Sequence, residues 1–162
     1  NDFKDYQFVI AGAPSQDRAF YDTFIKKANV SFINNETYNL LSVSTAALVT
    51  SGTATLETAL FKVPQVVCYK ANSISYQIAK RIITLKFISL VNLIMDKEVV
   101  IELIQNDFNP KRLKKELNNI LNKSKREDIF MNYFELEKKL GGKGASEKTA
   151  SLIFNAIKNN NS

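Results

Sequence analysis

The sequence contains no histidine and only one cysteine, Cys68. The lack of histidine removes the commonest general base and the commonest metal ligand of proteins, so a Ser-His-Asp triad, a Cys-His pair and a histidine-bound zinc site are excluded. Acid–base chemistry within this chain must therefore use Asp, Glu, Lys or Tyr. Cys68 lies in the apolar run Val66–Tyr69 and has no partner for an internal disulfide, which predicts a buried thiol in a reducing compartment.

Long apolar runs are also lacking. No run approaches the roughly 20 residues of a membrane-spanning helix, and no signal peptide opens the chain. The 162 residues are 45% hydrophobic and 23% charged, an ordinary globular balance. We expect a single domain over residues 1–162, located in the cytoplasm. Because the chain starts at Asn1 without an initiator methionine and runs directly into a strand-like segment, we expect it to be a fragment of a longer protein.

The chain carries a formal net charge of +6. Many lysines lie on helix-like segments opposite an apolar face, for example Lys111, Lys114 and Lys115 around Leu113 and Leu117. No recognised nucleic-acid motif accompanies the charge, so we expect no nucleic-acid binding. A weak attraction to anionic lipid headgroups remains open.

The first half of the chain alternates strand-like and helix-like segments. The predicted strands are Tyr6–Ala11, Val30–Ile33, Ala46–Thr50, Pro64–Tyr69 and Phe87–Leu90. The predicted helices between them are Asp17–Lys27, Thr37–Ser44, a segment from the Ser51–Thr53 turn through Phe61, and Ser73–Thr84. Because several strands are apolar on both faces, this order predicts a Rossmann-like three-layer α/β domain with a mostly parallel sheet.

The second half of the chain is predicted to be helical. One apolar segment covers Lys97–Gln105, and Asn109-Pro110 starts another helix, with Asn as the N-cap and Pro in the first position. Gly141-Gly142 ends a third helix. Ser146 is expected to cap a last helix, whose inward residues are Ala150, Ile153, Phe154 and Ile157.

The most informative segment is Ser51–Glu57 (SGTATLE), which follows a predicted central strand and opens a helix. Ligands of open parallel sheets bind at this edge, and the first turn of a helix favours an anion through its free N–H groups and its dipole. Gly52 removes a Cβ that would keep a diphosphate away, Ser51 and Thr53 offer hydroxyl donors, and Glu57 is placed to accept both hydroxyls of a ribose. The alternative is a plain cap and turn, with Thr53 as the N-cap and Glu57 a solvated acid.

Two further loops are expected at the same edge. Tyr69-Lys70-Ala71-Asn72 follows one strand, and Leu90–Leu93 follows the last one. Lys70 is suited to neutralise phosphate charge, and Asn92 to hydrogen-bond a sugar or a backbone group. Read alone, a solvated lysine and a turn-forming asparagine remain alternatives.

Several segments, in order and at characteristic spacing, resemble the lipid-A-disaccharide synthases. They are Ser51–Glu57 (SGTATLE), Pro64–Lys70 (PQVVCYK), Ile78–Ile82 (IAKRI), Ile88–Leu103 (ISLVNLIMDKEVVIEL), Asp107–Leu113 (DFNPKRL) and Gly141–Ala150. The resemblance covers most of the chain from about Ala46 onward, and the strands before it more loosely.

That family resembles other glycosyltransferases of the GT-B fold, in which two Rossmann-like domains enclose the active site. The resemblance implies that this chain is the C-terminal donor-binding half, inactive by itself. The implied reaction transfers 2,3-diacylglucosamine from its UDP derivative onto 2,3-diacylglucosamine 1-phosphate. It produces UDP and a β-1,6-linked lipid A disaccharide for the lipopolysaccharide of a Gram-negative bacterium. The resemblance further implies a position at the cytoplasmic face of the inner membrane, no cofactor and no metal.

By this resemblance, Ser51, Gly52 and Thr53 meet the diphosphate, Glu57 meets the ribose, and Tyr69, Lys70 and Asn92 border the donor. No residue of this chain is assigned as catalytic, because the family's general base and acceptor site belong to the N-terminal domain, the expected partner of this half. Two departures bear on these roles. Other members usually have Tyr-Arg in place of Tyr69-Lys70, and lysine makes no bidentate phosphate contact. They also often have Pro-Asn in place of Val91-Asn92.

Four further hypotheses remain open. A UDP-sugar 2-epimerase or another GT-B transferase would use a similar strand–Ser-Gly–helix–Glu arrangement, and a non-catalytic α/β interaction domain would lack UDP binding. The segment Ile74–Phe87 is either a packed core helix or a basic-apolar edge that meets acyl chains or the membrane. Self-association into a homodimer through an uncovered apolar face is left open.

Overall fold

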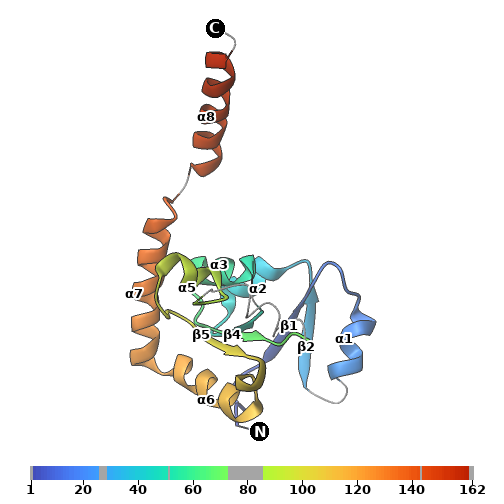
Figure 1. Ribbon diagram of the computed structural model, residues 1–162. Coiled ribbons are helices and arrows are strands. Elements are labelled where there is room, and N and C mark those ends of the chain that lie inside the picture. Colours follow the sequence, from blue (N-terminus) through green and yellow to red (C-terminus); the bar gives the residue numbers. More distant parts are fainter. Residues whose placement is uncertain (1, 26–28, 51, 73–85, 143, 161–162) are drawn as a thin grey trace. The chain divides into compact units, whose positions relative to one another are not determined.

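The structure is a computed structural model that describes residues 2–25, 29–50, 52–72, 86–142 and 144–160 (Figure 1). The chain forms two compact units, Asn1–Ser44 (unit 1) and Thr45–Ser162 (unit 2). The expectation of one domain over the whole chain stays a prediction.

Unit 1 contains one parallel strand pair with a helical crossover. Its elements in chain order are β1 (Phe8–Gly12), α1 (Arg18–Ile25), β2 (Val30–Asn34) and α2 (Thr37–Val43). The two strands pair in register from Phe8 opposite Val30 to Gly12 opposite Asn34. Asp17 caps α1 by accepting a hydrogen bond from the Phe20 N–H at 2.9 Å, as expected for an aspartate in front of an amphipathic helix.

Unit 2 contains a three-stranded parallel sheet in the order β3-β4-β5. Its elements are β3 (Ala47–Val49), α3 (Thr53–Leu60), β4 (Gln65–Tyr69), α5 (Leu90–Met95), β5 (Ile101–Ile104), the 3-10 turn η1 (Gln105–Asp107), α6 (Pro110–Leu121), α7 (Lys123–Lys139) and α8 (Ala145–Asn160). In Figure 1, α3 and α6 lie on opposite sides of this sheet, and both pack against β4. The mostly parallel, three-layer Rossmann-like prediction is confirmed.

The middle strand β4 carries the core of unit 2. Its residues Gln65, Val66, Val67 and Cys68 are all buried. A strand with neighbours on both sides and helices on both faces has no solvated face, so a continuous apolar run is what it requires. Leu103 on β5, together with Leu136 and Tyr133 on α7, completes the core at zero exposure.

Two predicted elements are wrong in type. The run Phe87–Leu90, expected as a strand, leads into helix α5. Ser89 is the N-cap of that helix, and its hydroxyl oxygen accepts a hydrogen bond from the Asn92 N–H at 3.3 Å. The segment Lys97–Gln105, expected as a helix, contains strand β5. Its paired apolar residues imitate a helical period, but the β-branched residues among them favour a strand.

The C-terminal helix differs from its prediction in start and in burial. Helix α8 begins at Ala145, so Ser146 lies inside the helix and does not precede it. Ile153, Phe154 and Ile157, expected to point inward, are each more than half exposed. An amphipathic stripe predicts a helix, but it does not identify the surface that covers the stripe.

The remaining predicted elements are found within two residues of their expected ends, and Asn109 caps α6 as predicted. The helix predicted at Ser73–Thr84 and most of the Ile74–Phe87 segment lie outside the described residues. Over the ranges that are described, no helix combines the length and the apolar character that a membrane span needs.

Candidate functional site

The three strands of unit 2 end together at one edge of the sheet. Val49 pairs with Val67, and Tyr69 pairs with Ile104, so β3, β4 and β5 run parallel and their carboxyl ends share that edge. The segments that follow, which begin at Thr50, Lys70 and Gln105, therefore start side by side. This edge is where open parallel sheets bind ligands.

Gly52 connects β3 to helix α3 through a backbone that only glycine adopts readily. Its dihedral angles are φ 112° and ψ −161°, a region essentially closed to residues with a Cβ. A Cβ built on Gly52 meets nothing within 4 Å, so the backbone angle and not the space requires glycine here. Ser51 lies outside the described residues.

Helix α3 begins at Thr53, with Gly52 as its N-cap and no side chain capping it. The alternative in which Thr53 is the N-cap is therefore wrong. Thr53 and Ala54 are exposed in the first turn, where helix N–H groups have no partner within the helix. The eight-residue helix directs the positive end of its dipole toward this turn.

Three buried side chains that the sequence analysis did not single out stabilise this turn through hydrogen bonds. The Thr55 hydroxyl donates to the Gly52 carbonyl at 2.8 Å, and the Gln65 amide donates to the Thr55 carbonyl at 2.9 Å and to the Tyr133 hydroxyl at 3.2 Å. All three side chains are buried, and burial raises the pKa of Tyr133 far above its ordinary value. Thr55 and Tyr133 look like ordinary core residues in sequence, and only the long-range contact reveals their role.

Glu57 lies one helical turn after Thr53, on the same face of α3. Its side chain is half-buried, and no described residue forms a hydrogen bond or an ion pair with the carboxylate. A carboxylate without such a partner, held on a rigid helix, is free to accept hydrogen bonds from a ligand.

Tyr69 is the last residue of β4 and is half-buried, while Lys70 directly follows and is exposed. The backbone beyond them is tied to β5, because the Gln105 carboxamide accepts from the Ala71 N–H at 2.8 Å and donates to the Ala71 carbonyl at 3.2 Å. Gln105 was not singled out from the sequence. Its side chain bridges the ends of β4 and β5.

Asn92 is fully buried, and its side chain is fully engaged within the chain. Its amide donates to the Val100 carbonyl and to Glu102, each at 2.8 Å, and its carbonyl oxygen accepts from the N–H groups of Val99 at 2.8 Å and Val100 at 3.0 Å. Of the two partners expected for Asn92, the structure shows the backbone. Contact with a sugar would require one of these bonds to break.

Glu102 was also missed in the sequence. Its carboxylate accepts from the N–H groups of Ile88 at 2.9 Å and Ser89 at 3.0 Å, and from Asn92. Three donors on one carboxylate fix the start of α5 on the sheet. The sequence signal that could have revealed this role is a single glutamate within the apolar run Val99–Ile104.

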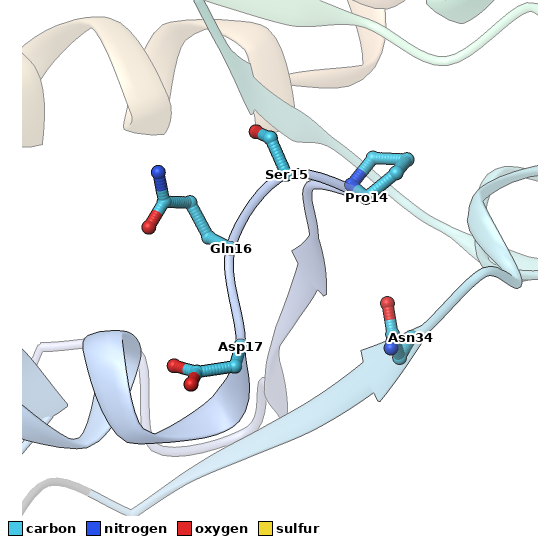
Figure 2. A pocket seen from close by; sticks show the side chains of 5 residues that line it. All are labelled: Pro14, Ser15, Gln16, Asp17 and Asn34. Atoms are coloured by element: carbon cyan, nitrogen blue, oxygen red, sulfur yellow. The ribbon is translucent and has the colours of Figure 1, made fainter.

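A separate hollow of about 470 Å³ lies in unit 1. Figure 2 shows its lining, the turn Pro14–Asp17 after β1 and Asn34 at the end of β2. Asp17 is already used as the cap of α1. None of the residues expected to bind a donor lines this hollow.

Parallel strands with helical crossovers define the chain as a Rossmann-like α/β protein. A profile of the family "Lipid-A-disaccharide synthetase" matches residues 1–156, and the chain belongs to this family, as its sequence segments indicated. The lipid-A-disaccharide synthase of Syntrophus aciditrophicus is 38% identical over 156 residues, which cover 94% of this chain and 41% of that protein.

Other relatives agree in name and in extent. The lipid-A-disaccharide synthase of Hahella chejuensis is 36% identical over 92% of this chain and 39% of its own length. The enzyme of that name from Anaeromyxobacter sp. (strain K) is 32% identical over 95% of this chain and 41% of its own length. The chain thus spans about two fifths of the length of these relatives.

Proposed function

We propose that this chain is the donor-binding half of a lipid-A-disaccharide synthase, a hexosyltransferase, and that the donor is UDP-2,3-diacylglucosamine. One observation carries the proposal. Gly52, in a backbone conformation that suits glycine, places the first turn of α3 at the carboxyl edge of the sheet. Glu57, whose carboxylate has no hydrogen-bond or ion-pair partner among the described residues, follows one turn further along. Family membership supports this assignment over a UDP-sugar 2-epimerase or a non-catalytic interaction domain.

In this proposal each residue has a stated chemical task. The N–H groups of the first turn and the hydroxyls of Ser51 and Thr53 bind the diphosphate, where the helix dipole favours negative charge. Glu57 accepts the ribose hydroxyls, and the exposed Lys70 supplies a positive charge beside the phosphates. These groups stabilise the charge that develops on UDP as it departs, which is how fixed dipoles accelerate group transfer.

The complete reaction needs the rest of the protein. The acceptor is 2,3-diacylglucosamine 1-phosphate, whose hydroxyl displaces UDP to give the β-1,6-linked disaccharide. The general base and the acceptor site belong to the N-terminal domain, the partner of this half. We therefore propose that the chain by itself binds donor without catalysing transfer.

The proposed location is the cytoplasmic face of the inner membrane, with peripheral attachment. Lys111 and Lys115 are exposed on α6 of a chain with a net charge of +6, and such lysines are attracted to anionic headgroups. Binding to vesicles with anionic phosphatidylglycerol, but not to pure phosphatidylcholine vesicles, is the expected result of a sedimentation assay. Equal binding to both would contradict an electrostatic attachment.

The donor site is tested by titrating UDP into the 162-residue chain and following backbone amide shifts by NMR. We expect the shifts to centre on residues 52–57 and on Lys70. Glu57→Gln keeps the shape of the side chain but removes its charge, and it is expected to weaken UDP binding by about tenfold, because hydrogen bonds to a charged group are the stronger ones.

The matched control is Glu98→Gln, the same chemical change on an exposed glutamate that precedes β5 and so belongs to the opposite edge of the sheet. This variant is expected to bind UDP as the wild type does. Equal weakening in both variants would indicate a general charge effect, and the absence of shifts at millimolar UDP would refute a donor site formed by this half alone.

A further inference from the structure

At the carboxyl edge of the unit 2 sheet, the side chain of Gln105 makes hydrogen bonds that a neighbouring strand would otherwise make. The β4–β5 ladder pairs Cys68 with Leu103 and Tyr69 with Ile104. One residue later the β5 backbone turns away, since Gln105 has φ 53° and opens the turn η1. The backbone ladder therefore stops beside Tyr69, just before the residues that follow β4 at the ligand edge.

The carboxamide of Gln105 extends this ladder by two hydrogen bonds. It accepts from the Ala71 N–H at 2.8 Å and donates to the Ala71 carbonyl at 3.2 Å. A primary amide has a carbonyl acceptor and an N–H donor on the same side, so it can pair with the N–H and the C=O of one residue, as a neighbouring strand would. Lys70 therefore lies between Tyr69, which pairs with Ile104, and Ala71, which is hydrogen-bonded to the Gln105 side chain.

The backbone of Gln105 is itself strained for this purpose. A residue with a Cβ rarely adopts a left-handed φ, and it persists there only where surrounding contacts impose it. Glycine or asparagine is the usual choice at such a position. From that backbone position the side chain of Gln105 reaches Ala71. This contact explains why a residue with a long side chain occupies a position where glycine would be less strained.

We propose that Gln105 is a positioning residue of the donor site, which holds the backbone of Lys70 and Ala71 so that the Lys70 ammonium meets the donor diphosphate. This inference rests on the proposed function. Gln105 touches no ligand in this role, and it acts on the donor through Lys70.

The test compares Gln105→Gly, Lys70→Ala and the double variant in the 162-residue chain. Glycine removes the clamp and relieves the strained φ, so the variant is not expected to lose its fold. We expect the Ala71 amide to lose its protection from hydrogen exchange, and UDP to bind about five- to tenfold more weakly, as for a loop that must be ordered on binding. The double variant should bind no more weakly than Lys70→Ala, because Gln105 acts through that lysine.

Asn106→Ala, on an exposed neighbour in the same turn, is the control and should leave both readouts unchanged. If Gln105→Gly exposes the Ala71 amide but binds UDP like the wild type, or if its effect adds fully to that of Lys70→Ala, the positioning role is refuted while the donor site stands. If the wild type itself gives no UDP shifts, the proposed function fails and the positioning role fails with it.

Discussion

Units 1 and 2 both pair parallel strands through helical crossovers, yet they differ sharply in burial. Of the buried hydrophobic residues in the described parts of the chain, Leu41 alone belongs to unit 1, and all the others belong to unit 2. The two strands of unit 1 are both edge strands, whereas β4 of unit 2 is flanked by β3 and β5. The comparison indicates that parallel strands and helices form a buried hydrophobic core where a central strand is covered on both faces.

A second difference concerns polar groups. Unit 2 buries Thr55, Gln65, Ser89 and Asn92 and satisfies nearly all of their side-chain atoms with hydrogen bonds; the Gln65 Oε1 atom is the buried exception among the described residues. Among the described residues, the side-chain hydrogen bonds of unit 1 are solvent-exposed, apart from the part-buried bond that the Ser44 hydroxyl donates to the Leu40 carbonyl. Buried bonds leave costly unpaired groups when one partner is removed, while exposed bonds are replaced by water.

The largest expected effect therefore comes from one asparagine substitution made in each unit. Asn92→Ala removes three buried hydrogen bonds and a part-buried one to Glu102. It leaves the Val100 N–H without its Asn92 partner, whereas the Val99 N–H keeps the Lys97 carbonyl at 3.0 Å. The substitution should therefore lower the free energy of unfolding by about 3 kcal/mol. Asn39→Ala in α2 loses a single exposed bond of 3.5 Å to Glu36. It should change the stability by less than about 0.5 kcal/mol, as measured by urea unfolding followed by circular dichroism. A comparable loss in both variants would contradict the difference between the units.

The same comparison is sharpened by one valine substitution in each unit. Val67→Ala in β4 removes two fully buried methyl groups and is expected to destabilise by about 2–3 kcal/mol. Val43 in α2 is 79% exposed, and alanine is the better helix former, so Val43→Ala should be neutral or slightly stabilising. Urea midpoints at constant m-value give both numbers. A destabilising Val43→Ala would show that unit 1 buries this side chain in solution.

The contrast between the units also explains how far the sequence could be interpreted. The run Pro64–Tyr69 predicted a buried strand correctly, because a strand buried on both faces is continuously apolar. The runs Phe87–Leu90 and Lys97–Gln105 were assigned wrongly, since short apolar runs do not distinguish a strand from a helix. There the deciding signals were the Ser89 cap of α5 and the β-branched residues Ile101 and Ile104 of β5.

Only some residues of the candidate site could be predicted from the sequence. Gly52, Thr53, Glu57 and Lys70 could be proposed because strand ends and helix starts can be read locally. Gln105 could not, because its partner Ala71 is 34 residues away and only the β4–β5 register brings the two together. Asn92 looked like a loop residue, whereas the structure uses its whole side chain in a buried network.

A smaller effect is expected from alkaline pH, and it arises in unit 2. Burial raises the pKa of the Cys68 thiol to about 11 from an ordinary 9.0. The unfolded chain therefore loses this proton near pH 9 while the folded chain keeps it, so stability falls as the pH rises from 9 to 11, by roughly 2 kcal/mol in all. Cys68→Ala should remove this part of the slope, and urea unfolding at pH 8, 9, 10 and 11 measures it. Identical slopes in the two proteins would show that the thiol is not buried in solution.

The smallest expected effect comes from Gly12, at the end of β1 in unit 1. A Cβ there would lie 2.4 Å from the tip of the Phe32 ring, a distance that real contacts do not reach. In a dense core such a clash is costly, but the Phe32 ring is only half-buried, so fewer neighbours oppose its displacement. We expect Gly12→Ala to destabilise by only about 1 kcal/mol, and to separate the Phe32 and Tyr21 rings, whose centroids lie 5.0 Å apart. Loss of the nuclear Overhauser contact between these rings measures the movement.

The control is made in a Phe32→Leu background, which lacks the distant ring atoms. There the added methyl group should have no effect. A much larger cost, undiminished in that background, would mean that unit 1 packs as rigidly as unit 2 and that the difference in burial does not extend to stability.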